Sequence, residues 1–260
     1  MASSLVSPRT APLHGPVYFP PRETQLRTEH SLQRVRGNNA LADCDEPTSL
    51  ARSILEKLNG IENSFSYPAG KVIFLEGQPC TGVYVLIRGH AKMVTGNRFG
   101  RMLIIRIVHP GQILGLHACL TDRPYDFTAE TTQNSRVAFV RHDDFINFLD
   151  HNSEGRRQAS EQISRDCQAA YDRIRTLGLS QTATEKLARL LLQWAADALV
   201  IDGIPRIKVS FTHDEIGQLI GTSRETVSRA LSQLKRQHIL ELSGSTLLIR
   251  DKEALRRLVG

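Results

Sequence analysis

The chain has 260 residues, enough for one large domain or two smaller ones with their own apolar cores. Hydrophobic residues make up 40% of it and charged residues 23%, which excludes wholesale disorder. No apolar run approaches the ~18 residues of a membrane-spanning helix. The formal net charge of +6 is only weak support for a nucleic-acid partner in a chain of this length.

The four cysteines, Cys44, Cys80, Cys119 and Cys167, are far apart in sequence and form no C-x-x-C pair. This spacing fits neither a zinc module nor a dense disulfide framework. The N-terminus also lacks the continuous apolar stretch of a secretory signal. We therefore expect reduced thiols in a cytoplasmic protein.

Residues 1–47 contain six of the eleven prolines and show no hydrophobic periodicity, so we predict a flexible tail there. The spacing of Leu50, Ile54, Leu55 and Leu58 predicts a short helix next.

Short β-rich runs separated by glycine or proline fill residues 61–141. The predicted strands cover residues 72–75, 83–87, 93–94, 102–108 and 137–140. Regularly spaced strands with glycine turns predict an antiparallel sandwich or barrel.

The hydrophobic period changes to 3.6 residues over 142–177. A narrow seam with steps of four and three is formed by Ile163, Cys167, Ala170, Ile174 and Leu177. Packing of this helix on its own domain is one interpretation. The narrow seam and its charged flanks favour the same helix of a second subunit, with Cys167 as a small core residue.

Residues 178–260 read as a compact mixed unit. Three helix starts are predicted from a threonine followed three residues later by glutamate, at Thr182, Thr212 and Thr222. The first helix is expected to extend to Leu199, and Gly221 to end the second. A strand is predicted at 206–211 and a hairpin over 239–249 around Gly244. Two short helices joined by a glycine turn and followed by a hairpin predict a winged helix-turn-helix.

The helix after Gly221 has two faces at 100° per residue. One face is apolar, with Val227, Ala230, Leu231 and Leu234. The other face carries Arg224, Glu225, Ser228 and Arg229, to which we assign DNA base readout. Arginine can donate paired hydrogen bonds to guanine, and glutamate can accept one from cytosine. Alternatively, Glu225 is only a capping residue and the arginines are solvated, but the capped helix before and the wing after favour DNA binding.

Phosphate contacts are assigned to four residues around this helix pair: Thr212, Ser223, Lys235 and Arg236.

The run Phe211-Thr-His-Asp-Glu-Ile-Gly-Gln-Leu-Ile-Gly-Thr-Ser-Arg-Glu-Thr-Val-Ser-Arg229 resembles the helix-turn-helix of the CRP/FNR transcription regulators. The segment order over 48–260 is similar too, as are the glycines of the β-rich part: Gly70, Gly77, Gly89, Gly111 and Gly115. The resemblance implies an α+β fold, with a cyclic-nucleotide-binding-like β-roll (jelly roll) as effector domain over 48–141. A dimerisation helix and hinge over 142–177 and a winged helix-turn-helix DNA-binding domain over 178–260 would follow.

The resemblance also implies a DNA target. Arg224, Glu225 and Arg229 match the R-E-x-x-x-R set of the CRP branch, which reads a TGTGA half-site. Glu225, Ser228 and Arg229 equally match the E-x-x-S-R set of the FNR branch, which reads TTGAT. We therefore expect a homodimer on a palindrome with a shared TGA core, the first bases staying open, and RNA polymerase as a further partner.

Cyclic AMP does not fit the matching positions. The ribose-binding Gly-Glu pair of the family is Gly115-Leu116 here, and leucine cannot accept from a ribose hydroxyl; an unpaired one costs about 1–3 kcal/mol. Arg123 stands at the phosphate-binding arginine position, but Pro124 follows it, and an ordinary surface arginine beside Asp122 is the alternative. Tyr171 lies where an adenine contact is expected. The candidate effector pocket is thus Gly115, Leu116, Arg123 and Tyr171.

Other cofactors are not expected either. An FNR-type iron–sulfur cluster needs a group of N-terminal cysteines, and only Cys44 lies there. His117 resembles the proximal histidine position of the family's haem-binding CO sensor, although we favour an ordinary polar histidine. A redox role for Cys80 or Cys119 lacks activating cations nearby in sequence, apart from Arg123.

Catalytic motifs such as a P-loop, H-E-x-x-H or G-x-S-x-G are absent from the sequence, so no enzyme activity is expected. Asp143 and Asp144 suit the start of a helix instead. A ligand-binding module without DNA function is the alternative to a regulator. An effector would act through the helix packing or through a hinge near Leu177-Gly178-Leu179.

Net charge is unevenly distributed: zero over 1–47, +5 over 48–141, −2 over 142–176 and +3 over 177–260. DNA binding is therefore inferred from where the basic residues stand, and not from their total. The net charge of +5 over residues 48–141 could attract an anionic effector or flanking DNA, or it is ordinary surface charge.

Overall fold

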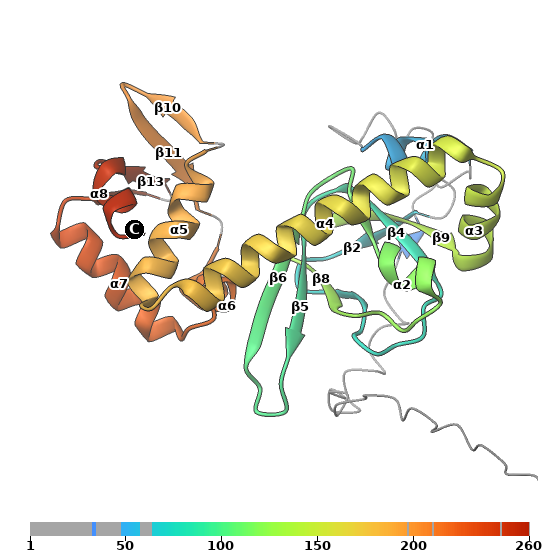
Figure 1. Cartoon of the computed structure of the whole chain (residues 1–260), viewed down its shortest axis with the longest axis horizontal. Helices are drawn as coiled ribbons and strands as arrows, with labels where there is room; N and C mark the ends of the chain where they lie inside the picture. Colours follow the sequence, from blue (N-terminus) through green and yellow to red (C-terminus); the bar gives the residue numbers. More distant parts are fainter. Residues whose placement is uncertain are drawn as a thin grey trace, which may run out of the picture.

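The computed structural model describes residues 33–34, 48–57, 64–196, 198–209, 211–244 and 246–259. A β-roll lies at one end of the molecule and a small helical unit at the other, and one long helix, α4 (Ser153–Leu179), runs between them (Figure 1). Most of the predicted tail, and Leu58 of the predicted short helix, lie outside the described residues. Within the tail, Gln33–Arg34 form a short strand, β1, that pairs with β2.

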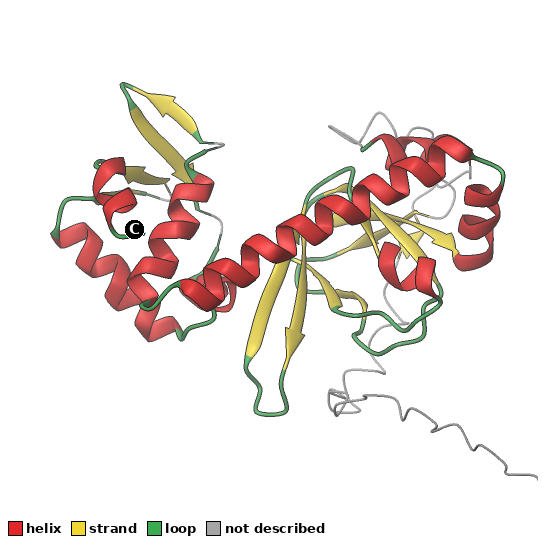
Figure 2. Ribbon diagram, viewed as in Figure 1, coloured by secondary structure: helices red, strands yellow, loops and turns green. Residues whose placement is uncertain are grey.

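The β-roll consists of two antiparallel sheets, as the sequence predicts (Figure 2). Their strand orders are β1-β2-β9-β4-β7 and β3-β8-β5-β6. The strands are β2 (Ser64–Tyr67), β3 (Val72–Phe74), β4 (Gly82–Arg88), β5 (Ala91–Gly96), β6 (Met102–Val108), β7 (Ile113–Leu114), β8 (Thr128–Thr131) and β9 (Ser135–Arg141). Strands β2, β7 and β8 are short, and the sequence did not predict them. A short helix, α2 (Leu116–Thr121), follows β7 and was also not predicted.

Strand β4 is buried on both faces because two different layers cover it. Alternate side chains of a strand point to opposite faces. Val83, Val85 and Ile87 pack in one apolar cluster with helices α1 (Ser49–Lys57), α3 (His142–Asp150) and α4. Leu86 packs in a second cluster inside the roll. The run of apolar residues in this strand thus joins the roll to its helices.

The helical segment predicted over 142–177 consists of two helices. Asp143 and Asp144 lie in the first turn of α3, as predicted. Asn152 caps the start of helix α4 (Ser153–Leu179), because its side chain accepts a hydrogen bond from the Gly155 amide. Residues 177–179, near which the hinge is predicted, are the last helical residues of α4. The link from α4 to the next helix is the segment 180–182.

The C-terminal unit is a winged helix-turn-helix, as predicted. Its elements are α5 (Ala183–Trp194), β10 (Leu199–Ile201), β11 (Ile204–Lys208), α6 (His213–Ile220), α7 (Arg224–Arg236), β12 (Leu240–Ser243), β13 (Thr246–Ile249) and α8 (Lys252–Arg257). The four strands form one sheet in the order β10-β11-β13-β12.

Two boundaries in this unit differ from the prediction. Leu199 is not helical but begins β10, because Asp202 and Gly203, with φ of 52° and 75°, form a two-residue hairpin turn. The strand predicted at 206–211 lies earlier, at Ile204–Lys208, because it pairs across that turn.

The apolar core of the C-terminal unit includes part of the β-roll. Val94 of β5 and Ile104 of β6 belong to the same buried cluster as Leu187, Leu219 and Ile220. The hairpin formed by β5 and β6 therefore connects the two halves through a common core, and not only through α4.

Candidate DNA interface and effector cavity

Helix α6 begins with a complete capping box. The Thr212 hydroxyl accepts from the Glu215 amide, and the Glu215 carboxylate accepts from the Thr212 amide at 3.0 Å. Gly221 ends the helix with a φ of 66°, a conformation that favours glycine. The Thr222 amide donates to the Gly217 carbonyl at 2.9 Å, which closes the turn before the next helix.

Helix α7 is capped by Ser223, and the prediction that Thr222 caps it is wrong. The Ser223 hydroxyl accepts from the Thr226 amide at 3.3 Å. Thr222 is instead held in the turn by its own amide. Because Ser223 is the cap, Arg224 is the first residue of the helix.

The two faces of α7 are separated as the sequence predicts. Its buried residues are Val227, Ala230, Leu231 and Leu234. The residues assigned to base readout lie on the opposite side: Arg224, Glu225 and Arg229 are exposed, and Ser228 is half-buried. All four phosphate candidates, Thr212, Ser223, Lys235 and Arg236, are exposed.

Neighbouring groups orient the side chains on the exposed face. Ser228 shares a hydrogen bond of 2.8 Å with the His213 ring at the start of α6. Arg229 donates to the Thr226 hydroxyl at 3.1 Å. Hydrogen bonds at the helix start, from its own amide and Ser223, and then nearby arginines keep the pKa of Glu225 below its usual range. The face thus presents cations and one ionised carboxylate, a set able to contact base edges and phosphates.

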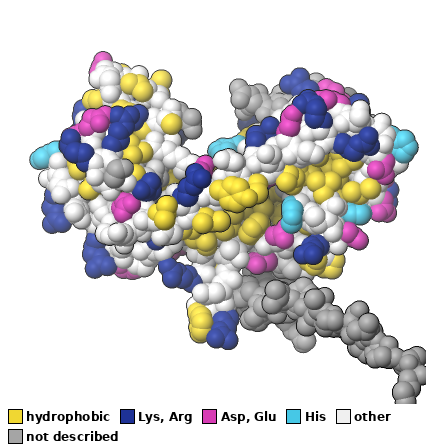
Figure 3. Space-filling view, in the orientation of Figure 1, with side chains coloured by type: hydrophobic (Ala, Val, Ile, Leu, Met, Phe, Trp, Pro, Cys, Tyr) yellow, Lys and Arg dark blue, Asp and Glu magenta, His cyan; other side chains and the backbone are white. Residues whose placement is uncertain are grey.

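The predicted seam on α4 is partly open to solvent in the single chain. Ile174 is 65% exposed and Cys167 is exposed, while Ile163, Ala170 and Leu177 are half-buried. Cys167 is therefore not a core residue of the single chain. Figure 3 shows hydrophobic side chains gathered along α4 and in the hollow beside it.

A cavity of about 380 Å³ lies between the β-roll and α4. Its walls are mainly apolar; they include Phe74, Ile113, Leu116, Tyr125, Phe127 and Ile163. Tyr125 has no free hydroxyl for a ligand, because this group donates to the Gly82 carbonyl at 2.8 Å and accepts from the Gly82 amide. The cavity has the apolar lining that is typical of small-molecule sites.

An ion pair spans the cavity from the sheet to the helix. Arg106 of β6 contacts the Asp166 carboxylate of α4 through Nη1, and its Nη2 donates to the Ile113 carbonyl at 3.3 Å. Gln162 donates to the same Asp166 oxygen at 3.0 Å. Burial lowers the pKa of Arg106, and Asp166 partly offsets this effect. A second pair, His117 and Asp126, lies 2.7 Å apart in a more exposed part of the lining.

The structure brings together only part of the predicted effector pocket. Gly115 and Leu116 line the cavity, and Leu116 is buried. Arg123 and Tyr171 are exposed and are not among its lining residues. Sequence reasoning missed Arg106 and Asp166. The available signal was a single charge inside the apolar strand Met102–Val108.

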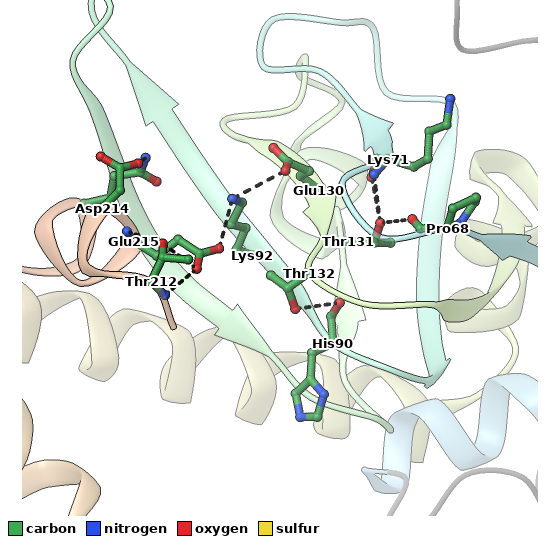
Figure 4. A network of polar contacts seen from close by, with 11 residues as sticks. Pro68, Lys71, His90, Lys92, Glu130, Thr131, Thr132, Thr212, Asp214 and Glu215 are labelled. Atoms are coloured by element: carbon green, nitrogen blue, oxygen red, sulfur yellow. Dashed lines mark hydrogen bonds and ion pairs between the residues drawn. The ribbon is translucent and has the colours of Figure 1, made fainter. Parts of the chain in front are cut away.

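The β5–β6 hairpin also makes polar contacts with the helix-turn-helix (Figure 4). Lys92 lies 3.4 Å from Glu130 on the neighbouring strand and 3.6 Å from Glu215, the capping residue of α6. Arg101 donates to the carbonyl of Gly221. These contacts connect the β-roll with both ends of α6.

Comparison with known proteins agrees with this architecture. The family model described as the Crp-like helix-turn-helix domain matches residues 185–258, and that of the cyclic nucleotide-binding domain matches residues 64–152. The chain belongs to the CRP/FNR family of transcription regulators. It is thus a CRP-like DNA-binding transcription regulator, and the family comprises regulators and not enzymes.

Several relatives match over most of their length. A CRP-like cAMP-activated global transcriptional regulator of Mycobacterium tuberculosis is 26% identical over 213 residues, 82% of this chain and 92% of the relative. The cAMP-activated regulator CRP of Escherichia coli is 24% identical over 186 residues, 70% and 87% of the two chains. The solved structure of FixK2 from Bradyrhizobium japonicum has a TM-score of 0.66 at 27% identity, covering 76% of this chain and 96% of that one.

Among the residues that the structure describes, no helix has both the length and the apolar character that a membrane span needs.

Proposed function

We propose that this protein acts as a homodimer that binds a palindromic DNA site whose half-sites contain TGA. The observation that carries the proposal is the exposed face of α7, where Arg224, Glu225 and Arg229 stand together while the opposite face is buried. A helix with this distribution can enter the major groove while the rest of the unit holds it.

The exposed apolar stripe of α4 supports the homodimer. Two recognition helices must lie about 34 Å apart to meet successive major grooves, so a pairing helix between them would set the distance. We expect Ile174→Glu to yield a monomer by light scattering and to lose binding to the palindrome. Arg175→Glu, its exposed neighbour on the same helix, is the control. A dimer that survives Ile174→Glu would contradict the role of this seam.

Selection from random DNA, followed by affinity measurements with variants, tests the readout. Arg224→Ala and Arg229→Ala are each expected to cost about 1–3 kcal/mol at one base pair and to relax specificity there. Lys235→Ala is expected to weaken all sequences alike and to reduce the salt dependence. Unchanged sequence preference in both arginine variants would overturn the assignment.

Cyclic AMP is not the effector that we propose, although it activates the M. tuberculosis and E. coli relatives by their names. The buried Leu116 offers no acceptor to a ribose, and Arg123 lies away from the cavity. Calorimetry with cAMP is expected to give no saturable heat. The absorbance spectrum of the same protein tests the haem alternative at His117, because a Soret band would identify haem.

As a regulator, the protein is expected to work in the cytoplasm, where it would meet RNA polymerase at its promoters.

A further inference from the structure

The cavity between the β-roll and α4 combines apolar walls with one arginine, Arg106, that has more donors than protein acceptors. Arg106 has five N–H donors, and its acceptors are the Asp166 carboxylate, the Ile113 carbonyl and, at 3.5 Å, the Met93 sulfur. Its side chain is only 19% exposed, and that of Asp166 is 31% exposed. A guanidinium in such surroundings needs an anion beside it, because an uncompensated buried charge is strongly unfavourable.

We infer that the cavity binds a small monocarboxylate with an apolar body, whose carboxylate takes the place of Asp166 on Arg106. The exchange replaces one carboxylate by another, so the guanidinium keeps its counter-charge throughout. A ligand carboxylate can also use two N–H groups of the planar fork. The apolar body fills the space between Ile113, Phe127 and Ile163.

The other charges of the lining select for a single negative charge. Asp126 lies in the lining beside His117, and Asp166 stays near the cavity after its release. Two carboxylates close to the ligand oppose a second negative charge on it. Polyanions such as nucleotides are therefore disfavoured, while an apolar monoanion meets one cation and matching walls.

Ligand binding would act on the helix that we propose for dimerisation. Asp166 stands on α4 between Ile163 and Ala170, which line the cavity and also belong to the predicted seam. Its release leaves a carboxylate on this part of α4 that is held only by Gln162 among its present partners. This last step rests on the proposed function, whereas the binding site itself does not.

Calorimetry on the full chain tests the site with three matched probes: 3-phenylpropanoate, its neutral amide and the dianion phenylsuccinate. We expect saturable binding of the monoacid, with the amide and the dianion about tenfold weaker or more. Arg106→Met is expected to weaken the acid about ten- to a hundredfold. Arg141→Met is the matched control, because Arg141 pairs with Asp144 on an exposed helix start outside the cavity lining.

Asp166→Asn is expected to change the affinity for the acid in the opposite direction to Arg106→Met. It therefore keeps the test decisive if Arg106→Met fails to fold. Removal of the competing carboxylate is expected to tighten binding of the acid and to leave the amide unchanged. Equal affinity for acid and amide, or an acid affinity that Asp166→Asn does not raise, would overturn the inference. So would a lack of saturable binding at millimolar concentration by 3-phenylpropanoate, 4-methylpentanoate and decanoate alike.

A separate anisotropy measurement with palindromic DNA distinguishes the two proposals. Acid binding with the expected variant pattern but no specific DNA binding would refute the proposed function and leave the site standing. Specific DNA binding without acid binding would do the reverse.

Discussion

In the C-terminal unit the candidate binding chemistry lies on an exposed helix face, whereas in the β-roll it lies inside a cavity. Side chains on an exposed face act on a large partner and need only a rigid helix behind them. Side chains in a cavity depend on one another, because each must fit both the ligand and the neighbouring side chains. In this chain the exposed chemistry is that of α7, and the enclosed chemistry is that of Leu116 and Arg106 in the cavity.

The largest effect is expected where the recognition helix meets its core. Leu234 of α7 is fully buried, so Leu234→Ala should destabilise the C-terminal unit by about 2–5 kcal/mol. Chemical denaturation measures this loss, and DNA affinity should fall with it. Leu242→Ala, at a half-exposed position of the wing, should stay within about 0.5 kcal/mol. A loss at Leu234 no larger than this control would show that the exposed face does not depend on that core.

The corresponding test inside the β-roll is Tyr125→Phe. It removes a buried hydroxyl that donates to the Gly82 carbonyl and accepts from the amides of Thr81 and Gly82. We expect a loss of about 1–3 kcal/mol, because three backbone groups lose a partner. Tyr171→Phe, at an exposed position of α4, is the control for thermal unfolding. Equal melting temperatures for the two variants would contradict this account.

A smaller effect is expected at the start of α6. Thr212→Ala removes the capping hydroxyl and should cost about 1 kcal/mol. Thr176→Ala near the C-terminal end of α4 should cost nothing, because Thr176 is no cap and alanine is the better helix former there. Denaturant midpoints compare the two. A loss at Thr176 equal to that at Thr212 would mean that capping is not the cause.

The smallest effect concerns pH. Burial lowers the pKa of His90. Burial, and then the nearby His90 and Arg106, lower the pKa of His109, and the centroids of the two histidine rings lie 5.0 Å apart. The unfolded chain thus binds more protons than the folded one just below pH 6.5, so stability falls as the pH falls through this range. His90→Gln should flatten the change in melting temperature between about pH 7.5 and 5.5. His151→Gln, at an exposed site, should leave it as steep as before.

Local sequence signals predict the recognition unit well, because capping residues, a glycine turn and a helical period lie close together in the chain. The errors are also local. Two adjacent hydroxyl residues, Thr222 and Ser223, can both cap a helix, and only the turn bond from the Thr222 amide decides between them. The Asp202–Gly203 pair is a local hairpin signal too, so the error at Leu199 has a local cause.

The cavity is harder to predict from the sequence. Arg106 and Asp166 are 60 residues apart, and the packing of α4 against the β-roll brings them together. Neither residue belongs to a recognisable motif. The resemblance to cAMP-binding members of the family points to a different arginine, Arg123. The sequence therefore predicts that cyclic AMP does not fit the cavity. It does not predict which residues of the cavity would contact another ligand.

The apolar cluster shared by Val94, Ile104 and the core of the C-terminal unit has a practical consequence. A fragment cut in the link at 180–182 would separate the helix-turn-helix from two buried residues of the β5–β6 hairpin. Both pieces would then present aliphatic surface to water, and such patches promote association. An isolated DNA-binding fragment should therefore be less soluble than the full chain unless polar residues replace the side chains that face Ile104.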